Sequence, residues 1–227
     1  MLEQARERTI EFQNRLTAAG IDTTIITDEN TIAYLAGFWG YLSVEFGRPT
    51  FLLLRSGEVP CVITPLMESE MVGNMTWVED VMTWDDMGPN HWEKVLLRAI
   101  GNKPGNIGVE LAVLPALVRN WFDDQMPSTK LTDVGAIMGS MRMIKSPEEI
   151  DVMRQTGQIA GAMMQAAESA LAEGAQEYES ALSVFYSVTR SASCFFTVLV
   201  FVAFISPLIH LFLLMHSCLY SSFLHRR

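Results

Sequence analysis

The sequence predicts an α/β fold, a mixed sheet flanked by helices, followed by a long linker helix and a hydrophobic C-terminal tail. Three observations support this prediction. Short β-branched or apolar segments alternate with amphipathic segments as far as residue 140. A strong helix start follows at Ser146, and the composition changes abruptly after Glu179. We therefore divide the chain into an α/β domain at 1–140, a linker with the first helix of a further domain at 141–179, and a tail at 180–227.

The composition limits the classes of partner. The chain has 227 residues, of which 49% are apolar, enough to bury a core. A formal net charge of -10 without a concentrated basic face argues against nucleic acid and leaves small molecules and proteins as partners. The charged N-terminus lacks the apolar stretch of a signal peptide, so we expect the body to be cytoplasmic. Three cysteines without a CxxC pair predict reduced structural thiols.

The first elements follow from periodicity and capping. Apolar residues recur at steps of three and four over 2–19 and predict a helix, which Gly20 ends. The β-branched stretch 23–27 predicts a buried strand. Asp28 to Asn30 then supply a cap for a brief helix at 31–37.

A hairpin and alternating elements complete the α/β domain. Strands at 50–55 and 59–65 flank the turn Ser56-Gly57-Glu58. The elements that follow are a helix at 66–75, a strand at 78–84, a helix at 91–101, a strand at 106–111 and a helix at 114–126. We place the end of the domain between Lys130 and Ser140.

The linker helix has a capping box at its start. Ser146 is the cap, Pro147 takes the first helical position, and Glu149 follows three residues after the cap. Apolar and small residues then step by three and four up to Leu171. The Gly157-to-Gly161 spacing, outside an apolar span, predicts close helix packing rather than dimerisation in a membrane.

The tail has a composition of its own. All 26 acidic residues precede Ser180, and the fixed charges of 180–227 are Arg190, Arg226 and Arg227. Residues 192–215 carry no fixed charge and are long enough to cross a bilayer, so they are a transmembrane candidate. The alternative is read-through or out-of-frame sequence, because U-rich codons produce Phe, Leu, Ser, Val and Cys. Both interpretations stay open.

Four stretches resemble a known family. They are "NTIAYLAGF", "EFGRPTFLLLRSGE", "IGVEL" and "MRMIKSPEEIDVMRQTGQIAGAMMQAA". Over about residues 1–179 the chain is similar to the N-terminal domain and linker of the creatinase and aminopeptidase P family, the pita-bread hydrolases that include the Xaa-Pro peptidases. The resemblance implies a non-catalytic α/β domain, followed by the first helix of a catalytic domain.

The resemblance also implies a reaction and its cofactor. Full-length relatives hydrolyse a C–N bond in Xaa-Pro peptides or a creatine-like substrate. Most hold a divalent metal pair (Mn, Co, Zn or Fe) on two Asp, one His and two Glu, all downstream of this linker. Creatinase-like members without metal use a histidine as acid and base.

Residues 180–227 contain no carboxylate with which to build such a centre. We therefore expect a truncated member that is inactive alone, with no catalytic residue, metal ligand or cofactor of its own. The alternative is a non-catalytic dimerisation or binding module, tethered to a membrane by the tail.

Phe46 and Arg48 are the candidate site residues. The Phe-Gly-Arg sequence at 46–48 is similar to one in creatinase, and the resemblance implies that it reaches across a homodimer into the partner's active site. Phe46 would wall the pocket, and Arg48 would hold the substrate carboxylate through two hydrogen bonds. The structural alternative is a surface charge at Arg48 and a core residue at Phe46. The partners predicted are a second copy or a full-length homologue, with a small-molecule or peptide substrate.

Other polar residues predict structural roles. Side chains of adjacent residues do not converge, so Asp85-Asp86 and Asp123-Asp124 are expected at solvated turns or caps rather than at a metal. His91, the one histidine before the tail, precedes a helix and is expected at the surface or as a cap. Trp39 and Tyr41 are expected to pack against the sheet.

Overall fold

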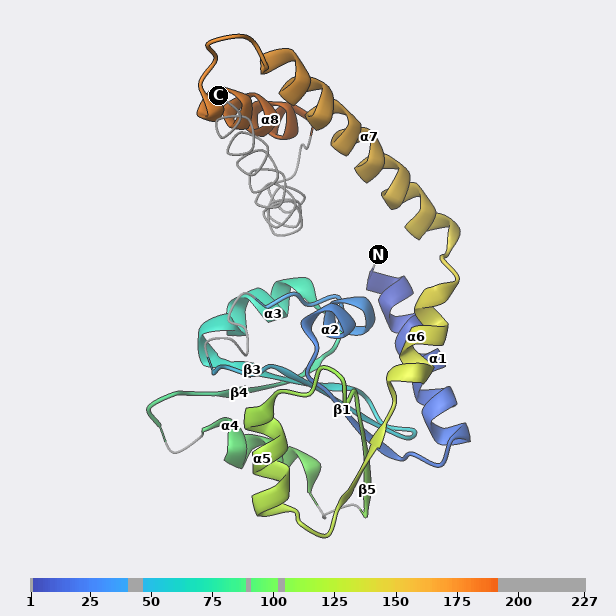
Figure 1. Ribbon diagram of the computed structural model, residues 1–227. Coiled ribbons are helices and arrows are strands. Elements are labelled where there is room, and N and C mark those ends of the chain that lie inside the picture. Colours follow the sequence, from blue (N-terminus) through green and yellow to red (C-terminus); the bar gives the residue numbers. More distant parts are fainter. Residues whose placement is uncertain (1, 41–46, 89–90, 102–104, 192–227) are drawn as a thin grey trace, which may run out of the picture. The chain divides into compact units, whose positions relative to one another are not determined.

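The computed structural model describes residues 2–40, 47–88, 91–101 and 105–191, which fall in two units (Figure 1). The first unit ends at Ile144 and the second begins at Lys145. In chain order the elements are α1 (Leu2–Ala18), β1 (Thr23–Ile26), α2 (Glu29–Ala36), β2 (Phe51–Arg55), β3 (Cys61–Pro65), the 3-10 helix η2 (Leu66–Glu68), α3 (Ser69–Met75), β4 (Asp80–Trp84), α4 (Trp92–Ile100), β5 (Asn106–Val109), α5 (Ala116–Gln125), β6 (Lys130–Asp133), α6 (Gly135–Met143), α7 (Pro147–Ala170) and α8 (Glu177–Ser191). We call the part up to Ile144 the sheet unit.

A mixed six-stranded sheet organises the sheet unit. The strand order is β4-β3-β2-β1-β5-β6. Strands β1, β2 and β3 pair antiparallel, whereas β3–β4, β1–β5 and β5–β6 are parallel. The predicted hairpin is confirmed, with Phe51 opposite Ile63 and Leu53 opposite Cys61. The mixed sheet predicted from alternating elements is therefore present.

Helices cover both faces of this sheet (Figure 1). Helices α1, α2, α3 and α6 pack on one face, and α4 and α5 pack on the other. Successive strand side chains point to opposite faces, so Ile25 belongs to the core under α4 and α5, and Ile26 to the core under the other helices. Because both faces are covered, β2 reads as the continuous apolar run Phe51 to Leu54 rather than as an alternating strand.

The predicted ends of α2 are confirmed. The carboxylate of Asp28 accepts a hydrogen bond from the backbone N–H of Thr31 at 2.8 Å. Gly37 ends the helix with a φ of 77°, in the left-handed region that glycine adopts without steric cost. The stretch "DENTIAYLAG" therefore sets its own boundaries.

Two elements of the sheet unit go beyond the predicted set. Strand β6 and helix α6 follow α5, so the unit continues past the interval between Lys130 and Ser140. The side chains of β6 are exposed or half-buried, and α6 buries Met138 against the sheet. Asp133 joins the two elements by accepting from the backbone N–H of Gly135 at 3.1 Å.

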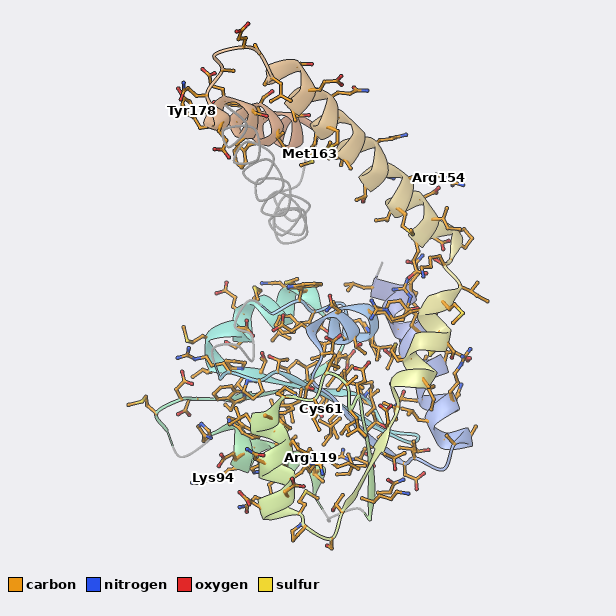
Figure 2. All side chains as sticks on the ribbon, viewed as in Figure 1. Cys61, Lys94, Arg119, Arg154, Met163 and Tyr178 are labelled. Carbon is orange, nitrogen blue, oxygen red and sulfur yellow. The ribbon has the colours of Figure 1, made fainter. Side chains whose placement is uncertain are left out.

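The second unit contains α7 and α8 as its described helices. The capping box is confirmed: the Ser146 hydroxyl accepts from the Glu149 N–H at 3.2 Å, and the Glu149 carboxylate accepts from the Ser146 N–H at 2.8 Å. Met163 lies between the two helices, whereas Arg154 points away from α8 (Figure 2). The close packing predicted at Gly157 and Gly161 is not found among the described residues, since a Cβ added at either meets nothing within 4 Å.

Within the described ranges, no helix combines the length and apolar character needed to cross a bilayer. The transmembrane candidate at 192–215 lies outside the described residues.

Candidate functional site

Arg48 lies in the short connection that enters β2. Gly47 has a φ of 68°, a conformation that favours glycine. The carbonyl oxygen of Pro49 accepts a hydrogen bond at 3.1 Å from the indole N–H of Trp84, which is buried at the end of β4. The backbone on both sides of Arg48 is thus held in a defined conformation.

Asp86 orients the guanidinium of Arg48. Nε and Nη2 of Arg48 lie 2.9 Å and 2.8 Å from the same oxygen, Oδ2 of Asp86. The pair is at the surface, with side-chain exposures of 32% and 36%. Asp86 therefore occupies the Nε edge of the guanidinium, whereas the Nη1 donors do not contact it. Because a guanidinium has five N–H donors, this arrangement can still bind a second carboxylate through Nη1.

The two acidic pairs have different surroundings. Asp86 is the ion-pair partner of Arg48 rather than only a solvated turn residue, and the separation of 38 positions between them hides this contact in the sequence. Asp123 pairs with Arg119 one turn earlier on α5, at an exposed position.

A divalent metal pair needs several converging ligands. Across the parts of the chain that the structure describes, no group of three or more His, Cys, Asp or Glu side chains is placed to hold a metal ion. These residues do not fit a two-metal centre, so no catalytic step is assigned to them.

The sequence singled out three aromatic residues on the N-terminal side of Arg48: Trp39, Tyr41 and Phe46. Phe46 and Tyr41 fall outside the described residues, and Trp39 is half-buried. The structure therefore places Arg48 but not its predicted companion Phe46.

His91 does not cap α4 through its side chain. It occupies the position before the helix, yet its imidazole makes no capping hydrogen bond. Instead its ring lies edge-on to Trp84, with centroids 5.8 Å apart, and 5.9 Å from the ring of Trp92. His91 is therefore the cap residue of α4 through its backbone and not through its side chain, and its half-buried ring packs against aromatic side chains.

A buried carboxyl at Glu110 was not singled out in the sequence. It follows β5, it is 9% exposed, and its Oε1 accepts from the Thr31 hydroxyl at 3.1 Å. Its Oε2 is buried without a hydrogen-bond partner among the described residues. Burial raises the pKa of Glu110 to about 7. The carboxylates of Asp28 and Asp133 also raise this pKa, whereas the Thr31 hydrogen bond and Arg142 lower it. The available signal was a charged residue directly after the buried strand "IGV".

Cys61 is a structural thiol, as the sequence predicts. It is free, buried in β3, and lies among the side chains of the sheet unit (Figure 2). Burial, together with the nearby Asp80, raises the pKa of the thiol to about 12. Because the thiolate is the reactive form, Cys61 is unsuited to nucleophilic chemistry.

Comparison with known proteins gives one family model and several relatives. Residues 8–144 match the model described as the Creatinase/Prolidase N-terminal domain. Creatinase from a Bacillus species is 28% identical over 182 residues, which are 79% of this chain and 43% of that protein. This chain thus spans less than half the length of that relative.

Solved structures agree in fold. The prolidase from Pyrococcus horikoshii has a TM-score of 0.68 at 20% identity, covering 82% of this chain and 49% of that chain. The creatinase/prolidase N-terminal domain of an Xaa-Pro dipeptidase from Streptococcus pyogenes has a TM-score of 0.51 at 16% identity, covering 60% of this chain and 98% of that chain. At these identities the likeness concerns the fold alone.

Proposed function

Because the chain belongs to the creatinase/prolidase N-terminal domain family, we propose that its sheet unit recognises the substrate of a hydrolase that cleaves a C–N bond. The proposed substrates are Xaa-Pro peptides or creatine-like amino acid derivatives, each with a carboxylate. The Phe-Gly-Arg sequence at 46–48 favours the creatine-like class. The observation that carries this proposal is the half-exposed Arg48 guanidinium, oriented by Asp86.

Arg48 is the group proposed to bind the substrate carboxylate. Its Nε edge is held by Asp86, so the guanidinium is oriented before a ligand arrives and loses less side-chain freedom on binding. By the resemblance, the site that it completes is in a partner copy or a full-length homologue, and Phe46 walls the same pocket. The role of the sheet unit is then binding and orientation rather than bond cleavage.

Charge reversal tests this role. In a complete relative with the same Phe-Gly-Arg sequence, replacing the arginine at the position of Arg48 with Glu removes a charge-assisted hydrogen bond and adds a repulsion. We expect KM for the carboxylate substrate to rise about 10- to 100-fold, with a smaller change in kcat. The matched Lys variant should keep part of the affinity, because it retains the charge without the planar pair of donors. Unchanged KM in the Glu variant would exclude the proposed contact.

Hydrolysis itself is proposed to need residues beyond those of this chain. The metal ligands of the family lie downstream of the linker, and residues 180–227 contain no Asp or Glu. We expect the purified 227-residue chain to show no turnover of creatine or Xaa-Pro dipeptides above a buffer blank, with Mn, Co, Zn or Fe added in turn. A complete relative assayed in parallel is the positive control. Metal-dependent turnover that co-elutes with the chain would contradict this proposal.

A second candidate function is a non-catalytic dimerisation or binding module, tethered to a membrane through residues 192–215. The charge-free run in those residues and the chain's span of less than half of creatinase favour it. Stable co-purification with a full-length homologue would support this function. Elution of the chain apart from the homologue would count against it.

A further inference from the structure

We propose that Glu68 is a positioning residue that fixes the described residues at the two ends of the segment 40–50, Gly40 and Thr50, and through Thr50 the position of Arg48. The inference rests on the proposed function, since it matters for substrate binding only if Arg48 is the anion-binding group. Glu68 ends the 3-10 helix that follows β3, and it is fully buried. A buried carboxyl group in a core costs free energy unless polar groups surround it, so its neighbours indicate its role.

Two threonines connect Glu68 to the C-terminal end of the segment. The Thr64 hydroxyl donates to Oε2 of Glu68 at 2.9 Å, and the Thr50 and Thr64 hydroxyl oxygens lie 3.0 Å apart. Because Thr64 uses its one hydrogen toward Glu68, Thr50 donates to Thr64. All three side chains are buried, which makes each of these hydrogen bonds stronger than at the surface.

Gly40 brings the N-terminal end of the segment to the same carboxylate. A Cβ added to Gly40 would lie 3.1 Å and 3.2 Å from the two carboxylate oxygens of Glu68, closer than ordinary contacts. The backbone of residue 40 therefore lies directly against the carboxylate. One buried carboxylate therefore lies against Gly40, just before residues 41–46, and is linked by hydrogen bonds to Thr50, four residues beyond them.

The position of Thr50 determines that of Arg48. Only Pro49 separates the two residues; its ring fixes φ, and its carbonyl accepts from Trp84. A shift at Thr50 would consequently move the backbone of Arg48 away from Asp86. An apolar side chain at position 68 would fill the same core space without connecting these groups, so we infer that the carboxylate serves to position the segment.

Hydrogen exchange and arginine modification test this inference in the full 227-residue chain. Glu68→Ala and the nearly isosteric Thr64→Val each break the chain of hydrogen bonds to Thr50. We expect amide exchange in peptides covering 47–50 to rise about 10-fold in both variants, the effect of losing one buried hydrogen bond of typical strength. Exchange in peptides covering 37–40 should rise in Glu68→Ala, which also removes the carboxylate beside Gly40. Phenylglyoxal should modify Arg48 several-fold faster, with the exposed Arg154 as internal reference.

Exchange in peptides from α4 and α5 separates positioning from general support of the fold. We expect amide exchange in α4 and α5 to stay unchanged in both variants. The matched control, Glu70→Gln on the exposed surface of α3, should change neither the amide exchange nor the rate of Arg48 modification. A uniform rise across the sheet unit, or no rise near Arg48, would overturn the proposal. If Glu68→Ala fails to fold, Thr64→Val decides. Neither readout uses substrate, so the two proposals can fail separately. Faster modification of Arg48 together with an unchanged KM in the relative's charge-reversal variant would contradict the proposed function and leave the positioning role of Glu68 supported.

Discussion

Replacing Trp92 with alanine is expected to lower the free energy of unfolding of the sheet unit by about 3–5 kcal/mol. Trp92 is 1% exposed at the start of α4, and its ring centroid lies 5.6 Å from that of Phe51 on β2 and 5.8 Å from that of Trp121 on α5. One side chain therefore joins two helices to the sheet. Its removal takes away buried area and leaves a cavity that rigid neighbours cannot close.

Urea unfolding followed by tryptophan fluorescence measures this change. All five tryptophans lie before residue 145, so the signal reports the sheet unit, and four remain in the Trp92→Ala variant. Because domains are stable by only about 5–15 kcal/mol, the loss should bring the unit close to unfolding at room temperature. Trp92→Phe should lose less, since it keeps a ring. A matched truncation at Met87, which is 98% exposed, should stay within about 0.5 kcal/mol of the parent. A similar small loss at Trp92 would mean that this core repacks readily.

The pattern of apolar residues predicts most helices and strands of the sheet unit, because buried positions must be apolar and so recur with the period of the element. The run from Phe51 to Leu54 and the stripe on α1 are long enough to identify strand and helix without tertiary information. Strand β6 has no such signal. It lies at the sheet edge, and its residues Lys130 to Asp133 alternate little in polarity. Its position comes from pairing with β5, a contact between residues more than 20 positions apart.

The candidate site shows the same limit. Residue types and the family resemblance single out Arg48, but the partner that orients it, Asp86, lies on a different connection. Glu68 sits in a stretch predicted as helical, where a glutamate would ordinarily face solvent. Its burial follows from the return of residues 40 and 50 to the end of β3, a property of the fold rather than of the local sequence.

The buried carboxyl of Glu110 predicts that the sheet unit becomes less stable as pH rises from about 4.5 to above 7. In the unfolded chain this group titrates near 4.5, whereas in the folded unit burial raises its pKa to about 7. The folded state thus retains a proton that the unfolded state has released. Stability from this group is fully present below pH 4.5 and is lost as pH rises through 7, by about 3 kcal/mol at most.

Replacing Glu110 with glutamine should remove that dependence. Glutamine is neutral at every pH and keeps an oxygen that can accept from the Thr31 hydroxyl, although its amide N–H groups are left to find a partner. We therefore expect the difference in unfolding free energy between Glu110→Gln and the parent to move in favour of the variant by about 2–3 kcal/mol between pH 4.5 and 8.5. Comparing the two chains at each pH cancels the titration of all other groups.

Glu70→Gln, at an exposed site on α3, is the matched control for the loss of one surface carboxylate. The charged groups around Glu110 set the size of the effect: Asp28 and Asp133 disfavour its ionisation, and Arg142 favours it. Arg142→Gln should therefore extend the loss of stability to higher pH, because the pKa of Glu110 in the folded unit is then higher. A pH profile of Glu110→Gln parallel to that of the parent would show that the pKa of Glu110 is the same in the folded unit as in the unfolded chain, which would contradict the prediction. Water would then have to reach the Oε2 atom, which the described structure encloses.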